Sequence, residues 1–434
     1  MDIVGVITVV ATILGGLAAV FYFWDRARSA KKRPTEVTSH EPTALSAFQA
    51  KPTDTEFAEK TYFRYRDLPC SLLESSKVVS YLESRYGCQA FRLGGRPLPV
   101  TVLWKNIDRM VQPENILGDF DATPPHSLLS SPILCPLDYQ EARDYVRRQY
   151  EAPPSRVHYE GCDYRMVALD LSAGLPKLNG AFGLYYDNIL TQYAMEWELK
   201  KALLRDVPDP VVELGRPGAL PLREAVEALG NPLLSGTGRC AAMTISTLVV
   251  FARSDGHHYT ILRRRSRNVG ISPGMLHVVP AGMFEAANTQ DAWSIETNIW
   301  RELLEEVYNE EEEIGSGDSE LEDYLRGRSP INLLLHLLKT GEAEISITGI
   351  CCDLLNLRPE ICTVLFVKDP AFAEARRMVL NWEYEREGPT GTFALNWDHV
   401  DEIMGRFAAD GGIVVSGAAC LGLGREWLKA RHGL

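Results

Sequence analysis

Several features that would point to common classes of protein are missing from this chain. Acidic side chains outnumber basic ones, 58 against 45, and the net charge of −13 argues against general affinity for nucleic acid, which calls for a basic surface. The nine cysteines include no C-x-x-C pair and follow no regular spacing. Adjacent Cys351 and Cys352 are predicted to be buried thiols of a strand, and this cysteine usage fits a reduced, cytoplasmic location. We find no internal repeat.

Positive charge is also missing from residues 1–24, where Asp2 is the only charged side chain. A cleaved signal peptide would carry cations before its apolar run. Ile3–Trp24 is an apolar run of 22 residues, long enough as a helix to span a hydrocarbon core of about 30 Å. Cations follow it closely, at Arg26, Arg28, Lys31, Lys32 and Arg33. Residues 1–24 are therefore predicted to be a single transmembrane helix of the cell membrane, with the soluble part in the cytoplasm.

The remaining length exceeds one typical domain, and composition divides it into three parts. Residues 25–58 are rich in Lys, Pro, Thr, Ser and Ala without apolar periodicity, which predicts a flexible linker. Residues 59–235 have a globular composition and no catalytic motif, and we expect a mixed α/β domain of unknown role there. Its predicted elements are helices at 78–86, 138–150, 187–204 and 222–229 and a strand at 99–104. Residues 236–434 form the second expected soluble domain.

The most informative segment is Arg301–Glu306, with the sequence R-E-L-L-E-E, inside a predicted amphipathic helix. Glu302, Glu305 and Glu306 share one arc of about 100° on that helix. A separate arc of about 140° is apolar, the width of a core-facing stripe; it contains Ile299, Trp300, Leu303, Leu304 and Val307. Three acids this close repel one another, and a hard divalent cation relieves the repulsion. Mg²⁺, or Mn²⁺, is the expected cofactor, since Mg²⁺ takes carboxylate oxygens and keeps positions open for water and phosphate.

Strand, glycine and helix follow one another around this segment. Strands are predicted at 247–253, 259–264, 345–353 and 361–367, a helix at 331–339, and a late strand feeding a helix at 393–400. This order resembles the Nudix hydrolase family, whose box is G-x5-E-x7-R-E-U-x-E-E-x-G-U, where U is apolar. Gly282 matches the opening glycine, Glu285 matches an acid often found three residues later, and Arg301–Glu306 matches R-E-U-x-E-E. The resemblance implies a Nudix-like α/β/α sandwich with a mixed sheet over residues 236–434, and an α/β (α+β) fold class for the chain.

The chain also departs from the family box. Eighteen residues separate its opening glycine from its arginine where the box has thirteen, so the loop carries about five extra residues. Asn288 stands at the place of the box's first glutamate when the loop is counted from the glycine, and Trp293 when it is counted from the arginine. Tyr308 replaces the second glycine. These departures put catalysis, more than the fold, in question.

The resemblance implies roles for the residues that match. Arg301 would orient the acidic face, and its i+4 spacing to Glu305 allows a direct ion pair. Glu302, Glu305 and Glu306 would hold Mg²⁺, and one of them is a candidate general base. The substrate-binding candidates are Gly282, Glu285 and Arg264, the last from an arginine cluster that either binds phosphate or is a solvated strand end. The family usually adds one glutamate from a late loop, and the candidates are Glu383, Glu385 and Glu387.

Two functions of different class are consistent with these residues. The first is a membrane-tethered, Mg²⁺-dependent hydrolase that cleaves a nucleoside diphosphate linked to another moiety. The second is a catalytically degenerate Nudix fold that binds a nucleotide as a sensor or effector in a bacterial signalling or defence system; the missing box glycine and first glutamate favour it. The expected partners are a nucleotide-type small molecule and the membrane. The sequence leaves the substrate and the oligomeric state open.

Overall fold

The computed structural model describes residues 73–123, 162–266, 272, 274–285, 293–310, 325–375, 378–379, 384, 394–410 and 412–434. The predicted transmembrane helix at 1–24, the predicted linker at 25–58 and the predicted helix at 138–150 lie outside these residues. Within them, no helix is both long enough and apolar enough to cross a membrane. By their contacts, the described residues all belong to one compact unit.

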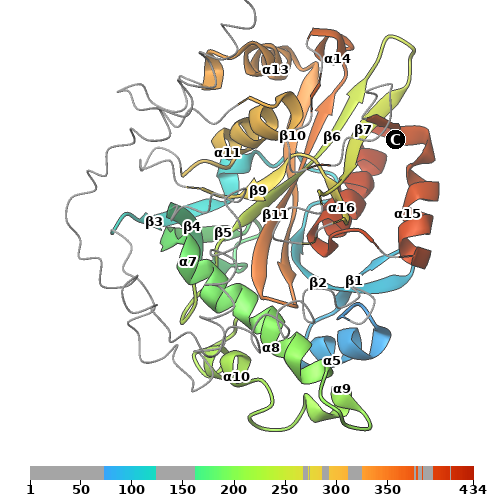
Figure 1. The fold of residues 1–434 in the computed structure, drawn as a ribbon. Coiled ribbons are helices and arrows are strands. Elements are labelled where there is room, and N and C mark those ends of the chain that lie inside the picture. Colours follow the sequence, from blue (N-terminus) through green and yellow to red (C-terminus); the bar gives the residue numbers. More distant parts are fainter. Residues whose placement is uncertain are drawn as a thin grey trace, which may run out of the picture. The chain divides into compact units, whose positions relative to one another are not determined.

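A mixed sheet forms the centre of the described structure (Figure 1). Its strands run in the order β1-β2-β10-β11-β6-β7-β12, with β8 beside β7 and β9 beside β6. They are β1 (Ala90–Leu93), β2 (Arg96–Lys105), β6 (Thr244–Ala252), β7 (His258–Arg264), β8 (Leu276–Val278), β9 (Ala281–Met283), β10 (Ala343–Asp353), β11 (Arg358–Val367) and β12 (Ala394–Asn396). β6 and β11 pair in parallel, whereas the other named pairs are antiparallel.

The central strands are continuous buried runs. Almost every residue of β6, β10 and β11 is buried, because a strand covered on both faces has no polar side. The predicted strands at 99–104, 247–253, 259–264, 345–353 and 361–367 correspond to β2, β6, β7, β10 and β11, and most of them start earlier than predicted. Cys351 and Cys352 are buried in β10, as predicted.

Helices cover both faces of this sheet (Figure 1). One face carries α11 (Ile295–Glu302), α13 (Ser329–Thr340) and α14 (Ala371–Ala375); the other carries α15 (Val400–Asp410) and α16 (Val415–His432). The predicted helix at 331–339 is α13, and the predicted late strand and helix are β12, the short turn η8 (Trp397–His399) and α15. Glycines bring α16 close to the sheet: a Cβ on Gly422 would lie 2.5 Å from Phe91, and one on Gly424 would lie 2.5 Å from Leu248.

The residues before β6 add a smaller sheet and several helices. That sheet contains β3 (Leu117–Asp121), β5 (Lys177–Leu184) and β4 (Cys162–Asp170) in this order, with β3 parallel and β4 antiparallel to β5. The helical elements are α5 (Ser76–Tyr86), η2 (Pro113–Ile116), α7 (Tyr185–Asn188), the π-helical η5 (Ile189–Tyr193), α8 (Ala194–Leu203), α9 (Pro210–Glu213) and α10 (Pro221–Glu227). The predicted helices at 78–86 and 222–229 are α5 and α10. The one predicted at 187–204 is divided by the π-helical turn into α7 and α8.

Two fully buried arginines connect this part of the chain to the main sheet: Arg223 in α10 and Arg239 in the segment before β6. Arg223 donates to the carbonyls of Leu354 and Leu355, and Arg239 donates to the carbonyl of Leu357, all in the turn between β10 and β11. β2 also pairs with β10, so residues on both sides of the predicted domain boundary share one sheet. The boundary placed after residue 235 therefore falls inside one compact unit. The prediction of a mixed α/β fold with a mixed sheet is confirmed at this coarse level.

Candidate functional site

The acidic helix changes its winding at the acids. Ser294 caps α11 by accepting a hydrogen bond from the Thr297 amide at 3.1 Å. After Glu302 the chain continues as the π-helical η7 (Leu303–Val307). All five predicted core-facing residues are buried: Ile299, Trp300, Leu303, Leu304 and Val307. The wider π turn begins directly after Glu302, and such turns are frequent at functional sites.

Arg301 lies among acidic side chains. Its Nη2 donates to Glu302 Oε1 at 2.5 Å and to the Met283 carbonyl at 3.0 Å. Its Nη1 lies 3.4 Å from Glu285 Oε2 and 3.7 Å from Glu305 Oε2. The i+4 ion pair between Arg301 and Glu305 is therefore formed. Three carboxylates therefore face this guanidinium.

Gly282 packs directly against the Glu302 carboxylate. A Cβ on Gly282 would lie 2.0 Å from Glu302 Oε1 and 2.1 Å from its carboxyl carbon, so a larger residue there would displace the carboxylate or the strand. Burial raises the pKa of Glu302 well above its usual value; Arg301 acts against this rise, and the neighbouring glutamates add to it. Such a carboxyl group binds a proton or a cation readily, because the isolated charged form is disfavoured.

Glu306 joins the acidic helix to the glycine strand and to a late segment. Its Oε2 accepts from the Ala281 amide at 2.7 Å, and its Oε1 accepts from the Tyr384 hydroxyl at 2.9 Å. The three late-loop candidates lie outside the described residues: Glu383, Glu385 and Glu387. Tyr384, which stands between two of them in sequence, is buried against the acidic helix. The late segment therefore reaches the site through a tyrosine hydroxyl.

Asp163 is an acid at this site that sequence reasoning missed. It belongs to β4 and stands opposite Glu285 in an isolated antiparallel bridge. Burial raises the pKa of Asp163 well above its usual value, Glu285 raises it further, and Arg301 lowers it. A single aspartate in a strand carries no signal in sequence. Only the pairing of two segments far apart in the chain brings it to the box.

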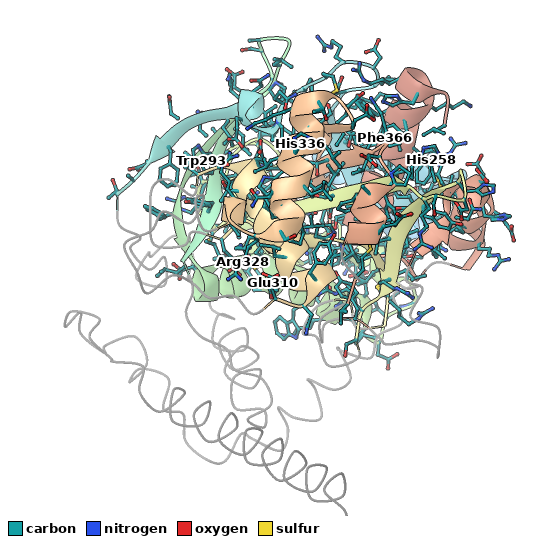
Figure 2. The ribbon with its side chains drawn as sticks, turned by 90° about the horizontal axis from the view of Figure 1, so that it is seen from above. His258, Trp293, Glu310, Arg328, His336 and Phe366 are labelled. Carbon is teal, nitrogen blue, oxygen red and sulfur yellow. The ribbon has the colours of Figure 1, made fainter. Side chains whose placement is uncertain are left out.

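The two ends of the extended box loop are held together. Trp293, labelled in Figure 2, follows this loop. Its ring stacks on Phe284 with centroids 5.3 Å apart and on Phe120 with centroids 5.0 Å apart. Gly180 makes room for this ring, because a Cβ there would lie 2.3 Å from it. Asn288 lies outside the described residues, and Trp293, the other position aligned with the box's first glutamate, is a packing residue.

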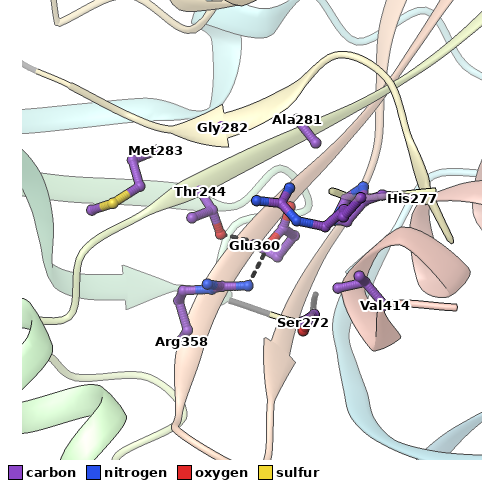
Figure 3. Close-up of a pocket in the computed structure, with 10 residues that line it drawn as sticks. Thr244, Ser272, His277, Ala281, Gly282, Met283, Arg358, Glu360 and Val414 are labelled. Carbon is purple, nitrogen blue, oxygen red and sulfur yellow. Dashed lines mark hydrogen bonds and ion pairs between the residues drawn. The ribbon is translucent and has the colours of Figure 1, made fainter. Parts of the chain in front are cut away.

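A pocket borders Gly282 and the start of β11 (Figure 3). Its space is about 420 Å³, counting the solvent at its mouth, and its polar lining residues include Thr244, Arg265, His277, Arg358 and Glu360. Two guanidinium groups, of Arg265 and Arg358, and one carboxylate, of Glu360, line it. Guanidinium groups are the side chains best suited to an anionic ligand.

The polar groups of the pocket are held by hydrogen bonds. Glu360 accepts from the hydroxyls of Thr244 and Ser246, and its Oε2 lies 3.9 Å from Arg358 Nη2. His277 Nδ1 lies 2.8 Å from the Val278 carbonyl, so this nitrogen carries the hydrogen and Nε2 is an acceptor. Burial, together with the positive charge of Arg265, lowers the pKa of His277 to about 3. The ring is therefore neutral at neutral pH.

The predicted substrate residue Arg264 does not line this pocket. It is exposed, and its Nη1 donates to the Gly274 carbonyl at 2.6 Å. Its neighbour Arg265 lines the pocket instead. Successive side chains of an extended chain point to opposite faces. Arg264 therefore points to the surface, whereas Arg265, one residue later, points into the pocket.

The acidic residues carry the carboxylate oxygens that a hard divalent cation prefers, and some of them are accessible to solvent. Glu285 and Glu305 keep 35% and 27% of their side chains exposed, and both Asp163 oxygens are buried without a hydrogen-bond partner. Within the described residues, no group of three or more His, Cys, Asp or Glu side chains has the geometry to hold a metal ion. Mg²⁺ often uses only one or two carboxylates and completes its shell with water and phosphate oxygens. Glu285 and Glu305, which reach solvent, would give a cation access to the buried carboxylates beside them.

No protein-family model matches the chain, and no curated protein matches it. The Nudix resemblance therefore remains a prediction that rests on the residues themselves. Its strongest support in the chain is the run Arg301–Glu306 together with Gly282.

Proposed function

We propose that the chain is a membrane-tethered, Mg²⁺-dependent Nudix-type hydrolase that cleaves a nucleoside diphosphate linked to another moiety. The observation that carries the proposal is the contact of Gly282 with the Glu302 carboxylate at the border of a pocket lined by two arginines. One glycine lies against the acidic helix and lines this pocket at the same time. Helices on both faces of a mixed sheet support a Nudix-like sandwich.

The pocket and the acids have separate tasks in this proposal. Arg265 and Arg358 bind phosphate oxygens, since guanidinium groups match them in charge and geometry. Glu302 and Glu305 hold Mg²⁺, which when bound supplies polarisation of a phosphoryl oxygen. We assign the general base to Glu305, because its partial exposure gives it access to water. Arg301 fixes the orientation of both carboxylates.

A second function, nucleotide binding without turnover, is favoured by particular contacts. Both oxygens of Glu306 are already hydrogen-bonded within the protein, which reduces its value as a metal ligand. Tyr308, at the place of the second box glycine, is 4% exposed and packs in the core. The pocket would bind a nucleotide equally well in such a sensor or effector, because its arginines do not depend on the metal site.

A substrate screen separates the two functions. The full chain, purified in mild detergent, is incubated with a panel of nucleoside diphosphate derivatives, with Mg²⁺ or with a chelator, and the products are resolved by chromatography. We expect Mg²⁺-dependent cleavage of the diphosphate linkage in at least one class. Saturable nucleotide binding without cleavage would establish the second function, and cleavage that persists in the chelator would contradict a metal-dependent reaction.

Membrane attachment is the other part of the proposal, and it rests on the apolar run Ile3–Trp24 and the cations after it. Full-length protein is expected to sediment with membranes and to resist alkaline extraction, and deletion of residues 1–34 is expected to release it. Protease added to intact cells should leave the soluble part uncut. Cleavage of that part from outside would overturn the cytoplasmic orientation.

A further inference from the structure

Asp163 is buried without the partners that a buried carboxyl group requires. Its side chain is 0% exposed, and neither Oδ1 nor Oδ2 has a hydrogen-bond partner. Transfer of a carboxylate from water to such a place is costly unless a donor or a cation compensates it. An unsatisfied buried group of this kind calls for a specific explanation, such as a bound ion.

The position of Asp163 directs it toward the acidic site. Asp163 and Glu285 are directly opposite residues of an antiparallel bridge. Side chains of such a pair project from the same face, with Cβ atoms about 5 Å apart. Glu285 Oε2 in turn lies 3.4 Å from Arg301, so this pair of carboxylates adjoins the acidic helix.

A second buried oxygen without a partner belongs to Asn188, whose side chain contacts Met283. Asn188 is 0% exposed and its Oδ1 has no hydrogen-bond partner, while its Nδ2 lies 3.8 Å from Met283 Sδ. Met283 is two residues before Glu285, and its carbonyl accepts from Arg301. Acceptor oxygens without donors therefore border Met283–Glu285, and among the described residues no basic side chain forms an ion pair with Asp163.

We propose that Asp163 and Glu285 bind a divalent cation between them. Asp163 comes from β4, which precedes the box in the chain, and Glu285 lies three residues after the opening glycine of the box. Two carboxylates are a sufficient protein contribution for Mg²⁺ or Mn²⁺, which complete their shells with water and phosphate oxygens. Glu285, 35% exposed, connects this site to solvent. The proposal rests on the proposed function for its role in turnover, but the cation site itself does not require that any substrate be cleaved.

The test is a titration of the metal-free full chain with Mn²⁺ alone, followed by calorimetry and by electron paramagnetic resonance of the free ion. We expect Asp163→Asn and Glu285→Gln each to weaken the affinity of one Mn²⁺ site about tenfold or more. The matched control is Asp119→Asn, which removes an exposed carboxylate from β3 of the same small sheet and should leave that affinity unchanged. Asp163→Asn keeps the shape of the side chain, and a melting curve without metal checks that the variant folds.

The outcomes are distinguishable from those of the substrate screen. Wild-type Mn²⁺ affinity in both Asp163→Asn and Glu285→Gln would overturn the site, whatever the activity. Loss of the Mn²⁺ site in these two variants but not in Glu305→Gln would support it even if no nucleotide is cleaved. If wild-type protein melts at a higher temperature with Mn²⁺, that increase should be smaller in Asp163→Asn.

Discussion

Replacement of Glu305 by glutamine is expected to reduce Mg²⁺-dependent cleavage about 100-fold or more, because several kcal/mol of charge stabilisation in the transition state are lost. The free energy of unfolding should stay level or rise. Glu305 is partly exposed, its contact with Arg301 is 3.7 Å long, and its charge adds to the repulsion on the buried Glu302. Initial rates at saturating Mg²⁺ and urea unfolding measure the two effects.

The matched control for this variant is Glu374→Gln. It makes the same chemical change at an exposed position of α14 and should alter neither rate nor stability. A Glu305→Gln protein that keeps the wild-type rate would remove Glu305 from the catalytic assignment. A large loss of stability would instead show that the 3.7 Å ion pair between Arg301 and Glu305 stabilises the fold.

The second large effect is expected from Gly282→Ala. Its new Cβ would lie 2.0 Å from Glu302 Oε1, so the carboxylate or the strand must move. Overpacking of this kind costs about 1–3 kcal/mol in the free energy of unfolding. Because β9 holds Gly282 between Ala281 and Met283, whose amide and carbonyl bind Glu306 and Arg301, cleavage should be lost as well.

Gly405→Ala is the control, since it lies in α15 with nothing within 4 Å of an added Cβ. Alanine in a helix interior there should raise the free energy of unfolding by about 0.5–1 kcal/mol. Chemical denaturation of both variants gives the comparison. If Gly282→Ala is as stable and as active as wild type, the close approach of Gly282 to the Glu302 carboxylate is not required for stability or activity.

The sequence predicts best where one local pattern decides the structure. β6, β10 and β11 are rich in apolar residues and almost wholly buried, and the apolar arc of the acidic helix is buried in full. Arg264 does not line the pocket whereas Arg265 does, because a difference of one residue in an extended segment exchanges the two faces.

The rest depends on pairings that no local pattern contains. Asp163 reaches the site through a bridge to Glu285, and Tyr384 reaches it through a hydroxyl bonded to Glu306. The predicted boundary after residue 235 follows a change in composition, yet β2 on its amino-terminal side completes the edge of β10. Composition reports on solubility and flexibility, and it carries no information about which distant strands pair.

The pairing of β2 with β10 sets an order for folding during synthesis. Thr101 pairs with Cys352, so β2 leaves the ribosome long before its partner is made. At the usual speed of synthesis this interval is about 10–50 s, and contacts so distant in sequence also slow folding itself. Throughout that time one edge of β2 has free amides and carbonyls, the condition under which strands of different chains associate. The nascent chain therefore depends on protection of this edge until β10 emerges.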